Sequence, residues 1–306
     1  MKINLSTPYK YSDINRRKFI INTAKSAGGF ALFSLQPFFD TESVSSINKQ
    51  LTVQQVIDII LKEGGLTPLT ETVDTIKYGQ ASQTVSGIVT TMFPTITVIE
   101  ETAKLGANFI IAHEPSFYNH TDNIEWVSNN SVLQQKQALL EKHKMIIWRF
   151  HDYCHSLKPD AISYGVAKKA GWLSYYKTGQ NILTIPPLPL KQLVQHLKSS
   201  LGIDHLRIIG SSEQRCERIA LLPGAWGGQR QVSTAETEKP DVLIVGEVSE
   251  WETAEYMRDA NLLGKKMALI VLGHSVSEEP GMEWLKPKLK DIKIAHVASG
   301  NPFTWL

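Results

Sequence analysis

Three short apolar segments, at residues 109–112, 145–150 and 267–272, each lead directly into histidine and carboxylate side chains. Neutral imidazole nitrogen combined with carboxylate oxygen is a typical ligand set for a first-row divalent metal ion. A single histidine after a strand is more often a locally bonded loop residue, but three such clusters in one chain indicate a shared site. The clusters are His113 with Glu114, His151 with Asp152 and His155, and His274 with Glu278 and Glu279.

The segments around these clusters alternate between short apolar runs and amphipathic stretches. This alternation predicts an α/β fold with largely parallel strands. Because ligands bind at the carboxyl ends of strands in open α/β sheets, we expect the clusters to lie at that edge. The polar stretch 229–240 is expected to be a loop. Strands are expected at 86–92, 109–112, 145–150, 182–185, 206–209, 219–222, 242–245, 267–272 and 292–295, and helices at 51–63, 95–105, 131–144, 190–201 and 250–263.

Length and charge restrict the function classes. At about 150 residues per domain, 306 residues predict two lobes. The chain has 32 basic and 30 acidic residues, but residues 1–40 hold six of the basic and two of the acidic ones. The rest therefore has 26 basic and 28 acidic residues, which does not suggest binding to nucleic acid or to an anionic membrane. Two cysteines cannot form a disulfide scaffold.

The first 46 residues have the character of a targeting segment. Arg16-Arg17 precede Phe-Ile and a weakly apolar run that contains Lys25 and is too short and too polar for a membrane-spanning helix. Paired arginines in this setting resemble a twin-arginine export signal. We therefore expect residues 1–46 to engage the twin-arginine translocase and the protein to be periplasmic or otherwise exported, without a stable membrane anchor.

Over residues 50–306 the chain resembles the Nif-three-like dinuclear metal-centre family, which includes type 2 GTP cyclohydrolase I homologues. The resemblance rests on the order and spacing of four segments. They are residues 106–117, the His151–His155 turn, the Pro223–Gly228 turn, and residues 241–247 followed by a helix, a strand and Gly273-His274-x-x-x-Glu278.

The resemblance implies two α/β lobes with a two-metal site in the cleft between them, and a ring-like homohexamer. We expect residues 47–175 to form the first lobe and residues 176–306 the second. His113, His274 and Glu278 match the family's ligands directly. Glu114 replaces a family histidine, and His155 replaces a family aspartate four residues after His151, which preserves the ligand count. We expect Asp152, ahead of Asp160, to be the nearest carboxylate able to replace the lost acid, and Glu247 to orient a ligand imidazole.

Two divalent ions (zinc, iron, manganese, cobalt or nickel) in such a site activate a bridging water and polarise a carbonyl or phosphoryl oxygen. The first hypothesis is therefore a metal-dependent hydrolase in which Glu279 or Asp152 acts as general base. The alternative is a non-catalytic metal-binding protein or oligomeric ring, and a third is an intracellular regulatory protein. The Gly224–Gly228 turn allows either close approach to a ligand or only a tight connection.

Overall fold

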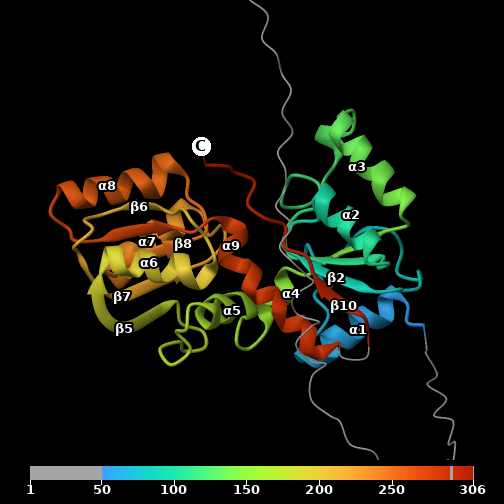
Figure 1. Ribbon diagram of the computed structural model, residues 1–306, viewed down its shortest axis with the longest axis horizontal. Coiled ribbons are helices and arrows are strands. Elements are labelled where there is room, and N and C mark those ends of the chain that lie inside the picture. The colour runs from blue at the N-terminus through green and yellow to red at the C-terminus, as the bar shows by residue number, and fades with distance from the viewer. Residues whose placement is uncertain (1–49, 290–291, 306) are drawn as a thin grey trace, which may run out of the picture. The chain divides into compact units, whose positions relative to one another are not determined.

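The computed structural model describes residues 50–289 and 292–305, which form one compact unit that contains two five-stranded sheets (Figure 1). The expected export signal at 1–46 lies outside the described residues. Each sheet is covered by helices on both faces, so the predicted fold class of two α/β lobes is confirmed. Among the described helices, none is long and apolar enough to cross a bilayer.

The first sheet has the strand order β1-β4-β3-β2-β10. Strands β4, β3, β2 and β10 are parallel, and the edge strand β1 pairs antiparallel with β4. The three inner strands are buried at every position, as expected for strands covered on both faces. The strands are β1 (Ile76–Tyr78), β2 (Ile88–Thr91), β3 (Phe109–Ala112), β4 (Ile146–Arg149) and β10 (Ile294–His296).

Helices pack on the two faces of this sheet. On one face, α1 (Val53–Gly64) buries an apolar stripe against the strands; the helix begins with a capping box at Thr52. On the other face lie α2 (Ile96–Lys104), the short η2 turn (Glu125–Val127) and α3 (Ser131–Lys142). Strands β3 and β4 are thereby fixed between two apolar layers, which sets the direction in which their carboxyl ends point.

The second sheet has the order β5-β7-β8-β9-β6, with β7, β8 and β9 parallel and both edge strands antiparallel. Helix α6 (Leu190–Leu201) packs on one face, and α7 (Gly228–Glu238), the π-helical turn η3 (Glu250–Ala254) and α8 (Glu255–Leu262) pack on the other. The strands are β5 (Ile182–Pro189), β6 (Arg207–Ile209), β7 (Arg215–Leu222), β8 (Val242–Val245) and β9 (Ala268–Val271).

Four further helical segments connect the sheets: α4 (Asp152–Ser156), α5 (Ala161–Lys169), α9 (His274–Glu278) and η4 (Glu279–Lys288). Helix α5 packs directly on η4 at two glycines. A Cβ atom on Gly165 would lie 2.5 Å from the backbone nitrogen of Gly281, so only glycine allows this approach.

The structure adds β1, η2, α4, α5, α9 and η4 to the expected elements. It also assigns two expected segments differently. The stretch 229–240 is not a loop; most of it forms α7, because Gln231 and Ala235 are buried against the sheet and its neighbours, and Gln231 accepts a hydrogen bond from Thr253. The chain's final strand, β10, pairs with β2 and belongs to the first sheet, as Figure 1 shows. The division at residues 175 and 176 stays a prediction.

Candidate metal centre

The ends of β3, β4 and β9 deliver the three histidine and carboxylate clusters to one place. Strand β3 leads into His113 and Glu114, β4 leads through Phe150 into His151, and β9 leads into α9, which carries His274 and Glu278 on successive turns of one face. These side chains therefore come from both lobes and meet within the described unit.

Short distances join all six expected metal ligands. Nε2 of His274 lies 3.0 Å from Glu278 Oε2 and 3.4 Å from Glu114 Oε1. Nε2 of His113 lies 3.6 Å from Glu278 Oε2. The rings of His151 and His155 lie 4.8 and 5.2 Å from the ring of His113, between centroids.

Two overlapping groups can each hold a cation. His113, His151 and His155 form one group, and His113, Glu114 and Glu278 form the other; the ligand atoms of each group lie within 4.8 Å of one another. His113 is fully buried, and its Nδ1 lies 3.0 Å from the Phe150 carbonyl. Its Nε2 has no hydrogen-bond partner among the described residues. A buried polar atom of this kind is costly unless something binds it, so the donor set fits a divalent metal ion.

A carboxylate orients each of the other three imidazoles. Nδ1 of His151 lies 2.8 Å from Asp152 Oδ1, Nδ1 of His155 lies 3.1 Å from Asp160 Oδ2, and Nδ1 of His274 lies 3.2 Å from Glu247 Oε2. At His151 and His155 these contacts place a proton on Nδ1 and leave Nε2 able to bind a metal, an arrangement that is usual around metal-ligating histidines. Nε2 of His274 instead contacts Glu278 Oε2, and His274 belongs to neither of the two groups above. Asp152 and Asp160 thus support different histidines.

The carboxylates make the site strongly attractive to positive charge. Burial tends to raise the pKa of Glu114, but contacts with His274, His113 and His151 outweigh it and lower that pKa to about 2. Burial lowers the pKa of His274, yet Glu114, Glu247 and Glu278 outweigh it and raise that pKa to about 12. Burial dominates at the other two residues, raising the pKa of Glu278 and lowering that of His113. These pKa shifts place positive charge on His274 and keep the buried His113 neutral.

Comparison with known proteins gives the family. The model of the Duf34/NIF3 (NGG1p interacting factor 3) family matches residues 72–302, three quarters of the chain. The chain belongs to the Duf34/NIF3 family.

Two curated relatives of this Duf34/NIF3 chain are GTP cyclohydrolase 1 type 2 homologs. The Clostridium acetobutylicum protein is 23% identical over 227 residues, which cover 70% of this chain and 80% of the relative. The Clostridium perfringens protein is 22% identical over 228 residues, which cover 71% and 82%.

Solved structures share the fold. A hypothetical protein of Staphylococcus aureus superposes with a TM-score of 0.65 at 18% identity over 84% of this chain and 100% of its own. A Bacillus cereus protein related to NIF3 gives a TM-score of 0.64 at 16% identity, over 84% and 100%.

The sequence did not single out Arg149, whose buried side chain holds His113 and Glu114 of this Duf34/NIF3 chain in place. The side chain is fully buried; its Nε donates to the His113 carbonyl over 3.1 Å, and its Nη2 lies 3.4 Å from Glu114 Oε2. Its Nη1 donates to the His120 carbonyl and lies 3.6 Å from Asp122 Oδ2. The available signal was an arginine at the end of a strand that is otherwise apolar.

The two expected catalytic carboxylates lie in different surroundings. Asp152 accepts hydrogen bonds from the Thr72 hydroxyl and the Val73 amide besides contacting His151. Partial burial raises its pKa, but these contacts outweigh it and lower the pKa to about 2. Glu279 accepts from the Ser299 amide and lies 3.5 Å from His296 Nε2. Their roles as general bases stay predictions.

The glycine-rich turn after β7 leaves room for the carboxylate group of Glu278. Gly224 has φ +75°, and a Cβ atom there would overlap the Glu278 carboxylate group. Gly224 also donates its amide to Ser277 in α9. The turn therefore allows the second lobe to approach a predicted metal ligand closely.

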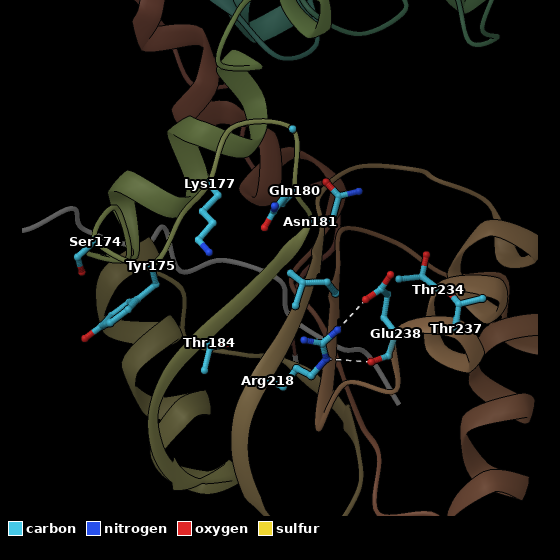
Figure 2. Close-up of a pocket in the computed structure, with 12 residues that line it drawn as sticks. Ser174, Tyr175, Lys177, Gln180, Asn181, Thr184, Arg218, Thr234, Thr237 and Glu238 are labelled. Atoms are coloured by element: carbon cyan, nitrogen blue, oxygen red, sulfur yellow. Dashed lines mark hydrogen bonds and ion pairs between the residues drawn. The ribbon is translucent and has the colours of Figure 1, made fainter.

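A separate cavity of about 790 Å³ lies in the second lobe (Figure 2). Arg218 on β7 forms an ion pair with Glu238 across part of this cavity, with Lys177 nearby. None of the six expected metal ligands lines it. The cavity therefore does not extend the candidate metal centre.

Proposed function

We propose that this Duf34/NIF3 protein is a metal-dependent hydrolase that binds two divalent first-row ions. The observation that carries the proposal is the buried His113 Nε2, which lacks a hydrogen-bond partner among the described residues and belongs to both overlapping ligand groups. His113 Nε2 can bind only one ion, so the carboxylates of Glu114 and Glu278, each with two oxygens, are the ligands that would bridge it to a neighbouring ion. The oxygen-rich group with Glu114 and the nitrogen-rich group with His151 and His155 give the two positions different ligand sets.

Bound ions would supply Lewis acidity and an acidified water molecule. The chain's own residues do the rest. Asp152, Asp160 and Glu247 hold the proton on Nδ1 of their histidines, so that each Nε2 keeps its direction. We assign Glu279 as general base, because Asp152 is occupied by three contacts and its low pKa makes it a poor proton acceptor.

The test begins with metal content. The full-length chain, purified without a histidine tag or chelator, should contain about two first-row metal ions, with His113→Ala and His274→Ala losing metal while keeping their circular dichroism. His143→Ala, which changes a histidine outside the cluster, is the matched control. Wild-type metal content in both site variants would refute the site assignment.

Turnover assays then distinguish a metal-dependent hydrolase from a non-catalytic metal-binding protein. Hydrolysis of a phosphodiester, a phosphomonoester or an aryl amide that disappears in His113→Ala would support a hydrolase, and GTP belongs in the panel because of the relatives' names. Two bound ions without turnover of any compound in the panel would favour the non-catalytic metal-binding alternative.

We also propose export and self-assembly. Residues 1–46 carry the arginine pair, so replacing Arg16 and Arg17 by lysine should retain the protein in the cytoplasm on cell fractionation. Homo-oligomerisation, as a hexamer by resemblance, is supported by large apolar side chains that are exposed on the described surface. They include Trp251, Leu262 and Leu263, which are 83%, 79% and 80% exposed. Light scattering of the purified chain tests the hexamer, and a monomer would refute it.

A further inference from the structure

A second cavity lies where α5 packs on η4, next to the metal centre. Its volume is about 820 Å³, and β2 and β10 contribute to its wall through Thr90 and His296. The close contact of Gly165 with Gly281 joins the two helical segments at this place. We call this cavity the lysine groove, after Lys168, Lys169, Lys286 and Lys288, which line it.

The charge of the lysine groove is unbalanced. Among the described residues that line the groove, Glu283 is the single acidic one. Within the described part of the chain, none of the four lysines lies within ion-pairing distance of a carboxylate. Elsewhere Lys77, Lys191 and Lys265 each have such a partner.

This concentration of positive charge stands out because residues 41–306 carry 26 basic and 28 acidic residues in total. A concave surface with one sign of charge raises the local concentration of counter-ions. Lysine ammonium groups bind phosphate and carboxylate as point charges, and several around one cavity favour a ligand with more than one negative charge.

One of the four lysines is positioned by aromatic packing. Nζ of Lys288 lies 5.4 Å from the centre of the Trp284 ring, and that ring stacks on Phe150 in the first lobe's core. A cation held over an indole face is stabilised by the ring. The opposite wall comes from α5, whose last turn carries Lys168 and Lys169. The four charges thus come from two segments that the glycine contact fixes together.

Residues that line the groove directly follow, in the sequence, residues beside the metal centre. Pro280 lines the groove and directly follows Glu279, and Ala161 lines it and directly follows Asp160, which contacts His155. His296, also in the lining, contacts Glu279. We propose that the lysine groove binds a small soluble molecule that carries at least two negative charges, such as a phosphate ester or a diphosphate. Binding there does not depend on the hydrolase activity proposed above.

Calorimetric titration of the full-length chain with inorganic pyrophosphate tests this inference. His113→Ala is the background, so that metal at the centre does not capture the probe. We expect saturable binding that weakens at least about tenfold when Lys168 and Lys286 are both changed to glutamine, and that weakens with rising salt. The matched control changes Lys62 and Lys142, which are also exposed and in last helical turns, and removes the same charge.

Three results would overturn the inference. The first is no binding of pyrophosphate at 1 mM by the background protein, and the second is an equal loss in the groove variant and in the control. The third is groove-dependent sedimentation with phosphatidylglycerol vesicles without binding of free pyrophosphate, which would identify a lipid headgroup as the source of the anion. Because metal content is measured separately, failure here is distinguishable from failure of the metal-centre proposal.

Discussion

Replacing Gly224 by alanine should move the Glu278 carboxylate away from the other expected metal ligands. Gly224 has φ +75°, where a residue with a Cβ atom costs roughly 1–2 kcal/mol. The new methyl group would also occupy the space of the Glu278 carboxylate. The carboxylate would have to move away from His274, with which it makes a 3.0 Å contact. Losing a charged hydrogen bond in a buried site costs about 1.5–3 kcal/mol.

Gly227→Ala separates the two contributions. Gly227 has nearly the same backbone angle, φ +78°, but a Cβ atom there would have no neighbour within 4 Å. Both variants should lose roughly 1–2 kcal/mol of unfolding free energy from the backbone. Gly224→Ala alone should lose at least about 1.5 kcal/mol more of unfolding free energy, because the Glu278 carboxylate is displaced.

The assay combines urea unfolding with metal competition against a fluorescent chelator. Gly224→Ala should bind metal at least about tenfold more weakly than wild type, since even outer partners of metal ligands change affinity by 10–100-fold. Gly227→Ala should bind metal as wild type does. Equal metal affinity of the two variants would refute the reasoning that Gly224 exists to admit Glu278.

Three further predictions concern buried or supporting charges. Arg149→Met should lower the unfolding free energy by about 3–5 kcal/mol in urea titration, because Glu114 and Asp122 lose a buried cation. Burial outweighs the attraction of Asp122 and lowers the pKa of Lys136 to about 8. The unfolded state therefore binds more protons than the folded state between pH 8 and pH 10.5. Across that window the unfolding free energy of the wild type, relative to that of Lys136→Met, should rise by roughly 1.4 kcal/mol per pH unit. Parallel curves of unfolding free energy against pH for the two proteins would contradict this prediction. Glu247→Gln should weaken metal binding about 10–100-fold without changing thermal stability of the metal-free protein by more than about 1 kcal/mol, as measured by chelator competition and calorimetry.

Much of the fold could be predicted because its strands are short, continuous apolar runs. Strands β3 and β8 and helix α6 have the expected character, since full burial on both faces leaves a strong local signal. Helix α7 could not be predicted from its polar residues, because its burial of Gln231 depends on Thr253, more than twenty residues away. The pairing of β10 with β2 likewise joins segments that lie far apart in the sequence, so no local pattern predicts it.

The clustering of the six expected metal ligands could be predicted because each follows a strand, and strand ends converge in an α/β sheet. Metal binding by these residues stays a prediction. Arg149, Asp122 and the role of Gly224 were not found. Each acts through a partner that is distant in sequence: Gly224, for example, matters only because Glu278 is folded against it. Local patterns therefore identify donors, while the residues that hold the donors in place require the three-dimensional structure.

The return of β10 to the first sheet has a consequence for biosynthesis. The second sheet, β5 to β9, is complete once residue 271 has left the ribosome, whereas the first sheet still lacks its edge strand at residues 294–296. The η4 side chains Met282 and Leu285 also belong to the first lobe's core. We therefore expect the second lobe, although it is synthesised later, to complete its sheet before the first lobe does. A chain that stops before η4 would therefore leave the amino-terminal lobe without its edge strand β10 and without the core side chains Met282 and Leu285.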